Sequence, residues 1–184
     1  MEIQEAIKSR RSIRRYKTTP VDDKTLELVL EAARWAPSWA NTQCCKLIVV
    51  RDAKTKSELA STMPESNPAF NAVREAPIVI VAGAELGKAG YLKGEQTTDK
   101  GESWYMFDVA LVMQNLVLSA HSLGLGTVYI GNFDANKVAR ILEVPPGFCV
   151  VTMTPLGYPD QQPGPKSRKE LSEIVSYEKY GLKQ

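Results

Sequence analysis

Six positive charges and no negative charge lie within residues 8–17, here called the basic segment, which contains Arg10-Arg11-Ser12-Ile13-Arg14-Arg15-Tyr16. The whole chain carries 23 basic and 21 acidic residues, so its net charge is only +2. A charge cluster in a nearly neutral protein indicates one localised anion as its ligand. The donor fork of arginine matches a phosphate, and the Ser12 hydroxyl adds a short donor. The basic segment therefore predicts a phosphate site, with a solvated basic surface as the alternative.

A second basic group, Lys166-Ser167-Arg168-Lys169, lies near the other end of the chain. Two basic groups at opposite ends of one sequence can fold onto the same phosphate. A nucleic-acid ligand is disfavoured, because acidic residues nearly cancel the charge and no zinc-finger, RNP or helix-turn-helix signature is present. Tyr16 alone is also too little for a base-stacking platform. A non-enzymatic module that binds RNA or an acidic partner through the basic segment stays open as an alternative.

The sequence contains few residues that could form a metal site, a catalytic nucleophile or a disulfide framework. His121 is the single histidine, so a histidine metal site is not expected, and a Ser-His-Asp or Cys-His nucleophile would depend on this residue alone. Three cysteines do not make a disulfide framework, and the first residues lack the apolar core of a signal peptide. A reducing cytoplasm is therefore the predicted location. Two glycine motifs, at residues 83–88 and 124–126, fail to match nucleotide-binding fingerprints in length or context.

One domain, spanning residues 1–184, must position these groups. Sequence patterns predict helices over residues 2–8, 26–35 (after a cap at Asp22 and before Pro37), 54–61, 68–75 and 134–142. Residues 104–123 are apolar on nearly every side and predict a helix through the core. Short apolar runs predict strands over residues 46–51, 77–82, 127–130 and 148–153. Residues 38–43 form a polar loop, residues 85–103 a mobile loop, and the residues after 159 a partly extended tail. The uncharged stretch 109–133 indicates a buried helix leading into a strand, not a membrane span. Intermixed helices and strands predict an α+β domain with three layers, α-β-α, around a mixed, mainly antiparallel sheet.

Four motifs together, in order and spacing, resemble the nitroreductase family of FMN-dependent oxidoreductases over essentially the whole chain. They are Arg10-Arg11-Ser12-Ile13-Arg14, Ala36-Pro37-Ser38-Trp39-Ala40-Asn41-Thr42-Gln43, the turn from His121 to Gly126 that leads into Ile130-Gly131, and Gly157-Tyr158-Pro159 followed by Lys166-Ser167-Arg168. The resemblance implies a homodimer with FMN at the interface of the two chains. It also implies that hydride passes from NADH or NADPH through flavin N5 to a nitroaromatic, a quinone or a similar flat acceptor, in ping-pong order.

The resemblance further implies which residues bind FMN. The phosphate, ribityl chain and pyrimidine edge correspond to Arg10, Arg11, Ser12 and Arg14, with Lys166 and Arg168 as late phosphate ligands. The polar loop, with Pro37, Ser38, Asn41 and Gln43, reaches the flavin partly from the partner subunit. Asn71 matches a hydrogen-bonding position at the ring, and the backbone of Ile130 and Gly131 matches the strand end that faces N5 and O4.

Several alternatives stay open beside this interpretation. Ser38 and Asn41 also suit a simple turn, Asn71 suits a helix surface, and Gly131 suits a loop. The chain has Cys44-Cys45 where the family often has Pro-Trp, and adjacent cysteines entering a strand suit buried small hydrophobes. A family branch with other flavin chemistry, a dehydrogenase or a flavin-destroying enzyme, would share the FMN residues and differ in the loop 85–103.

Overall fold

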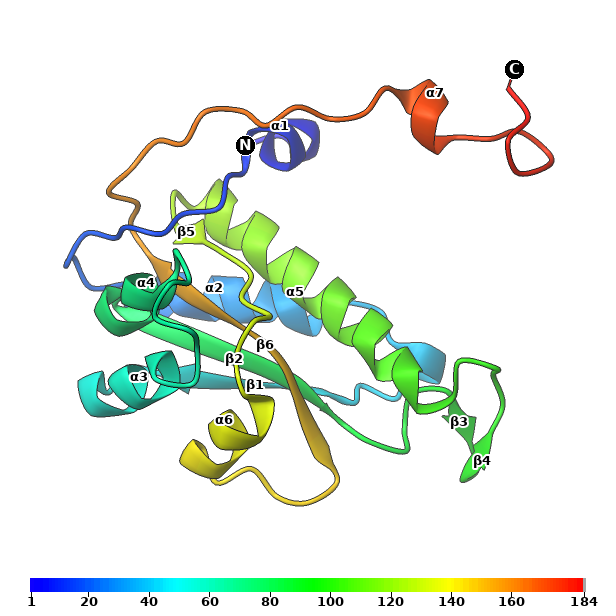
Figure 1. Ribbon diagram of the computed structural model, residues 1–184, viewed down its shortest axis with the longest axis horizontal. Helices are drawn as coiled ribbons and strands as arrows, with labels where there is room; N and C mark the ends of the chain where they lie inside the picture. Colours follow the sequence, from blue (N-terminus) through cyan, green and yellow to red (C-terminus); the bar gives the residue numbers. More distant parts are fainter. Residues whose placement is uncertain (184) are drawn as a thin grey trace.

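The computed structural model describes residues 1–183, and its centre is a four-stranded sheet in the order β1-β2-β6-β5 (Figure 1). The strands are β1 (Cys45–Val50), β2 (Ile78–Glu85), β6 (Phe148–Gly157) and β5 (Gly126–Thr127). Neighbouring strands of this sheet are antiparallel to each other. A mixed sheet also needs parallel pairing. Among the described residues, parallel pairing with this sheet occurs as one isolated bridge, between Ser12 and Thr127.

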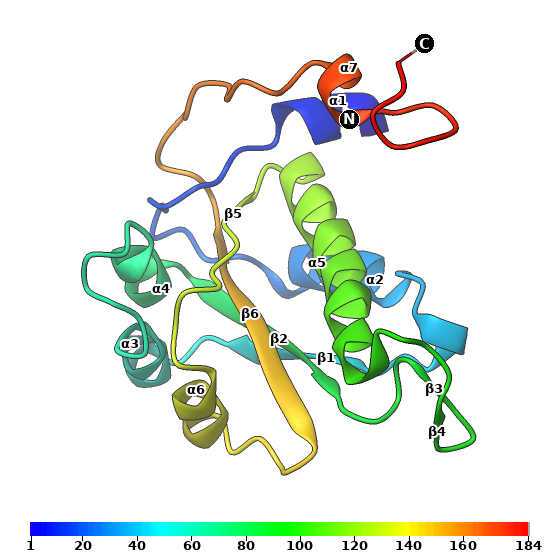
Figure 2. The same ribbon diagram turned by 45° about the vertical axis from the view of Figure 1, so that its right-hand side comes forward.

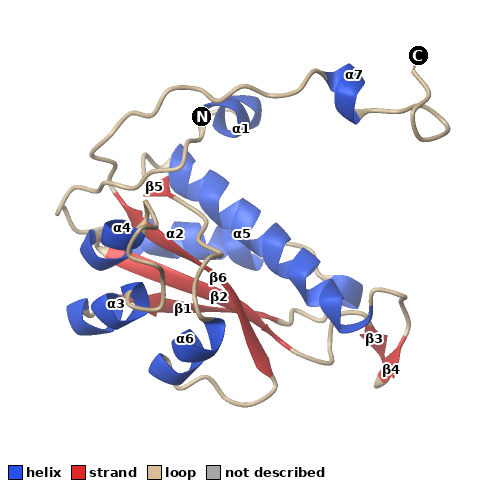
Figure 3. Ribbon diagram, in the orientation of Figure 1, coloured by secondary structure: helices blue, strands red, loops and turns tan. Residues whose placement is uncertain are grey.

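Helices cover both faces of the sheet, as Figure 2 and Figure 3 show. α2 (Asp23–Arg34) and α5 (Trp104–Ser122) lie on one face, and α3 (Ala53–Ala60), α4 (Phe70–Glu75) and α6 (Ala135–Ile141) lie on the other. Ile78 and Ile80 of β2 pack with the α2 and α5 layer, whereas Val79 and Val81 pack with the opposite layer. Because both faces are buried, β2 is apolar along its whole length. The expected α+β class and its three layers are therefore present.

The helices lie close to their predicted bounds. The predicted cap at Asp22 is confirmed, because its carboxylate accepts a hydrogen bond from the Thr25 backbone N–H at 2.9 Å. The first helix, α1 (Ile3–Ser9), packs against α5. None of the helices within residues 1–183 is long and apolar enough to cross a bilayer.

The strand predicted over residues 127–130 is wrong in extent, because β5 ends at Thr127. The Val128 backbone N–H donates to the Thr154 hydroxyl at 3.2 Å instead of to a strand carbonyl. Pairing resumes at one bridge, between Ile130 and Met153. In the same register Val128 lies opposite Pro155, which has no N–H to donate, so the ladder is interrupted there.

Two segments expected to be irregular contain short elements. Within residues 85–103, β3 (Tyr91–Leu92) and β4 (Glu95–Gln96) form a hairpin, and a 3-10 turn, η2 (Gly101–Ser103), leads into α5. Lys93 and Gly94 in the hairpin turn have φ of 51° and 84°, the left-handed pair that a two-residue hairpin requires. The tail contains the short helix α7 (Leu171–Ile174) and extends past α1, beyond the rest of the fold (Figure 1).

The contact between the basic segment and β5 requires glycine at position 126. A Cβ atom there would lie 2.8 Å from Cβ, Cγ1 and Cγ2 of Ile13. We expect Gly126→Ala to displace the basic segment and to lower the free energy of unfolding by about 1–3 kcal/mol, as measured by chemical denaturation. Gly164→Ala is the control, since no atom lies within 4 Å of the added methyl. Equal losses in the two variants would contradict the prediction.

Candidate functional site

The basic segment is bound to the edge of the sheet by backbone hydrogen bonds. The Ile13 N–H donates to the Thr127 carbonyl at 2.9 Å, and the Lys17 N–H donates to the Tyr158 carbonyl at 2.9 Å. The Tyr16 hydroxyl donates to the Ile13 carbonyl at 2.6 Å, and burial raises the pKa of Tyr16, so it stays a donor. These bonds hold the segment with Ile13 buried and with Arg14 exposed.

Arg10 carries an unsatisfied buried donor. Its Nη1 atom is buried and has no hydrogen-bond partner among the described residues. Burial is the main cause that lowers the pKa of His121, and the positive charges of Arg10 and Arg11 lower it further. The Nε2 atom of His121 lies 2.8 Å from the Ser9 hydroxyl. A buried donor without an acceptor costs free energy, and an anionic acceptor at this position would remove that cost. The arrangement therefore fits the phosphate predicted for the basic segment.

The strand edge beyond β5 forms a second part of the site. The backbone N–H of Ile130 donates to the Met153 carbonyl at 3.0 Å, and its carbonyl accepts from the Thr152 hydroxyl at 2.9 Å. These bonds fix the peptide that precedes Gly131, which is exposed. A cavity of about 450 Å³ lies beside this edge, against α5, and is lined mainly by apolar groups that include Val109, Ala110, Met113, Tyr129 and Val151. Such a cavity suits a flat aromatic ring.

Burial raises the pKa of Tyr129, and the charge of Arg10 opposes this shift. The Tyr129 hydroxyl donates to the Gln114 side-chain oxygen at 3.0 Å. The basic segment pairs with β5 at Thr127, three residues before Ile130, so the structure brings this segment and the strand edge into one region.

Three other predicted cofactor residues, Asn71, Lys166 and Arg168, do not line the cavity beside α5. Asn71 lies on α4 with its side chain exposed. Lys166 and Arg168 are exposed in the tail, and the Arg168 Nη1 atom donates to the carbonyls of Lys166 and Ser167 at 3.3 and 3.0 Å. The start of the tail, at residues 161–163, and Arg11 line a common cavity of about 340 Å³. The structure thus brings the tail to the basic segment, whereas Arg168 contacts its own backbone.

The polar loop has a strained backbone. Ala40, Asn41 and Gln43 have φ of 42°, 55° and 50°, and none of them is glycine. The Ser38 hydroxyl closes the loop by accepting from the Gln43 N–H at 2.9 Å. Asn41 and Gln43 are exposed, as is Pro37. Left-handed residues other than glycine cost about 1–3 kcal/mol each and cluster at functional sites, which supports the predicted role of this loop.

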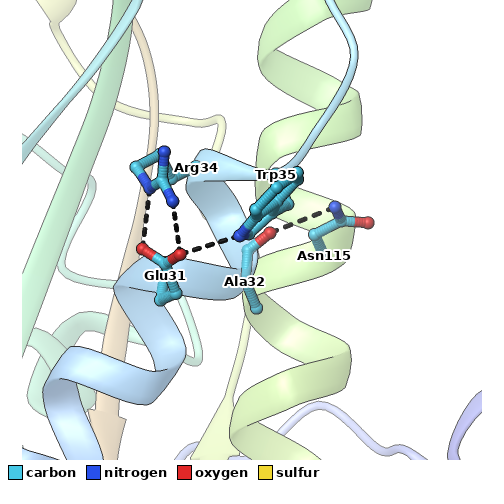
Figure 4. A network of polar contacts seen from close by, with 5 residues as sticks. All are labelled: Glu31, Ala32, Arg34, Trp35 and Asn115. Atoms are coloured by element: carbon cyan, nitrogen blue, oxygen red, sulfur yellow. Dashed lines mark hydrogen bonds and ion pairs between the residues drawn. The ribbon is translucent and has the colours of Figure 1, made fainter.

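A polar network ends α2 directly before the polar loop (Figure 4). Glu31 accepts from Nε of Arg34 and from Nε1 of Trp35, each at 2.7 Å. These two hydrogen bonds, from Arg34 first, lower the pKa of Glu31 to about 2. Asn115 of α5 donates to the Ala32 carbonyl at 3.1 Å and joins the two helices. The network therefore fixes the point from which the chain enters the loop.

The polar loop and the basic segment lie at opposite ends of the domain (Figure 1, Figure 2). At the start of α5, the Trp39 ring of the polar loop packs against the Trp104 ring, with 4.8 Å between ring centroids. At the end of α5, Ser9 of the basic segment contacts His121. A helix rises 1.5 Å per residue, so about 25 Å separates the two contact points. One chain therefore does not bring both predicted groups onto one small molecule.

Sequence reasoning missed Asp108, which contacts the polar loop from α5. The available signal was one carboxylate in a mainly apolar helix that has no other Asp, Glu, Lys or Arg. The expected burial of the cysteine pair is confirmed for Cys44, whereas Cys45 is only partly buried. The Cys44 thiol also donates to Asp108.

Comparison with known proteins gives the relationship of the chain. The model of the Nitroreductase family matches residues 7–158. An NADH dehydrogenase of Thermus thermophilus is 30% identical over 95% of both chains, and an FMN reductase [NAD(P)H] of Bacillus subtilis is 28% identical over 97% of this chain and 74% of its own. A Desulfovibrio desulfuricans structure solved in complex with FMN is 30% identical, with a TM-score of 0.78 over 98% of both chains. The chain belongs to the nitroreductase family.

Proposed function

We propose that this protein is a homodimeric, FMN-dependent NAD(P)H oxidoreductase that reduces nitroaromatic, quinone or similar flat acceptors in ping-pong order. The observation that carries the proposal is the buried Nη1 of Arg10, which has no hydrogen-bond partner among the described residues. Family membership and the FMN-bound relative support the same cofactor. When bound, FMN supplies hydride acceptance from NAD(P)H and hydride delivery to the second substrate.

Each part of the site has a task in this proposal. Arg10, Arg11 and Ser12 bind the phosphate, and Lys166 and Arg168 approach it from the tail. Arg14 is exposed, and in this proposal its permanent positive charge stabilises the negative charge that develops on the pyrimidine edge of the flavin.

In this proposal, the flavin ring is bound by groups of the strand edge at Ile130 and of α4. The hydrogen bonds of Ile130 to β6 hold the exposed Gly131, whose backbone faces the flavin ring in this proposal, and Asn71 adds a side-chain amide. The apolar cavity excludes water from the face of the ring. These residues bind and orient the flavin, and none of them needs to act as an acid or a base.

The proposed homodimer rests on the separation of the polar loop from the basic segment. A second copy brings its own polar loop, with Pro37, Ser38, Asn41 and Gln43, to the flavin that the first copy holds. The tail exposes large apolar side chains, including Leu171 at 73% and Ile174 at 64%. A run of exposed apolar groups of this kind is typical of a protein interface.

The visible spectrum and the steady-state kinetics test the proposed function. The purified protein should show an oxidised flavin spectrum that NADH or NADPH bleaches. With one slot for donor and acceptor, double-reciprocal plots against NAD(P)H at several quinone concentrations should be parallel. Intersecting lines would contradict the shared slot, and a colourless protein that gains no flavin signal with added FMN would contradict the enzyme class.

A further inference from the structure

We propose that Asp108 is a positioning residue that holds the polar loop in the shape that the flavin needs, an inference that rests on the proposed function. Asp108 lies on α5 and is 1% exposed. It is the one buried carboxylate in the part of the chain that the structure describes. A buried charge is costly unless nearby donors satisfy it, so its partners show what it stabilises.

The donors to Asp108 come from the two ends of the polar loop. The Trp39 backbone N–H donates to both carboxylate oxygens, Oδ1 at 3.2 Å and Oδ2 at 3.1 Å. The Cys44 thiol, directly after the loop, donates to Oδ2 at 3.5 Å. One carboxylate therefore joins the residue after Ser38 to the residue after Gln43. Hydrogen bonds to an ionised acceptor are roughly twice as strong as neutral ones.

The loop needs such a restraint because its own backbone is unfavourable. Three left-handed residues without glycine would relax toward extended conformations if both ends were free. Trp39 is held in addition by its contact with Trp104 and by a 3.3 Å hydrogen bond from Nε1 to the Tyr91 carbonyl. Loss of the carboxylate would leave the Trp39 N–H without its acceptor. Asn41 and Gln43 would then lose their fixed orientation toward the ligand.

Asp108→Ala, Asp108→Asn and Cys44→Ala test this role. In the flavin-free protein, near-ultraviolet circular dichroism reports the Trp39–Trp104 pair. We expect Asp108→Ala to diminish that signal and to weaken FMN and riboflavin alike, by about tenfold or more, because the loop faces the ring and not the phosphate. Asp108→Asn keeps an oxygen for the Trp39 N–H and should restore most of the affinity. Cys44→Ala removes one donor and should give a smaller loss.

Asp52→Ala is the matched control, because Asp52 also accepts a backbone N–H, from Thr55 at 2.8 Å, at the start of α3 and away from the loop. It should lower the thermal midpoint without changing the affinity for either flavin. Unchanged flavin affinity in Asp108→Ala, with or without a dichroism change, would overturn the inference. An equal affinity loss in Asp52→Ala would also overturn it, because the effect would then follow stability alone. A wild-type protein that binds no flavin would instead overturn the proposed function and the inference with it.

Discussion

Replacement of Arg10 by alanine is expected to weaken FMN binding by about ten- to a hundredfold and to leave riboflavin binding largely unchanged. Riboflavin lacks the phosphate, and the buried Nη1 atom of Arg10 has no acceptor among the described residues. The loss of one charge-assisted hydrogen bond to a phosphate costs about 1.5–3 kcal/mol. Titration of the apoprotein with each flavin, followed by fluorescence quenching, measures the two affinities.

Arg15→Ala is the matched control for this substitution. Arg15 has the same charge and lies in the same segment, but it is exposed, and its backbone carbonyl accepts from the Asp160 N–H at 2.9 Å, a bond that alanine retains. It should reduce FMN affinity only slightly, through the general loss of positive charge, and more weakly still at high salt. Equal losses for FMN and riboflavin in Arg10→Ala would show that Arg10 is not a phosphate ligand.

Removal of residues 170–184 is expected to convert the protein to a monomer and to weaken flavin binding by about a hundredfold or more, since several hydrogen-bonding groups of a second copy leave the site together. The deletion keeps Lys166 and Arg168, so it tests the partner and not the phosphate ligands. It removes the exposed apolar residues of the tail, among them Leu171, Ile174 and Tyr180. Light scattering and flavin content measure the two effects.

A point substitution separates assembly from chain length. Ile174→Asp places a charge on the apolar side of α7 and should shift the equilibrium toward monomer, because burying an unpaired charge at an interface is costly. Ser172→Asp changes the charge of the same short helix at a polar position and should leave assembly intact. A truncated monomer with full flavin content would refute the proposal that the partner completes the site.

Local signals predicted those parts of the fold that local physics determines. The apolar run that became β2 required burial on both faces. The stretch 104–123 is apolar on nearly every side and therefore predicted a helix through the core. The basic segment was evident because charge clusters are visible without a structure.

Contacts between distant residues could not be predicted in this way. Directly after β5, the Val128 N–H bonds to the hydroxyl of Thr154, which is 26 residues away. The bond from Trp39 to Asp108 spans 69 residues, and no periodicity reports it. Sequence order likewise contained no indication that the polar loop and the basic segment would lie at opposite ends of α5.

That separation has a genetic consequence. In the proposed assembly, each flavin centre takes its basic segment from one polypeptide and its polar loop from the other. A chain altered at Arg10 and a chain altered at Asp108 would then complement each other when produced together. Their mixed pair would concentrate both defects in one centre and leave the other with two intact halves.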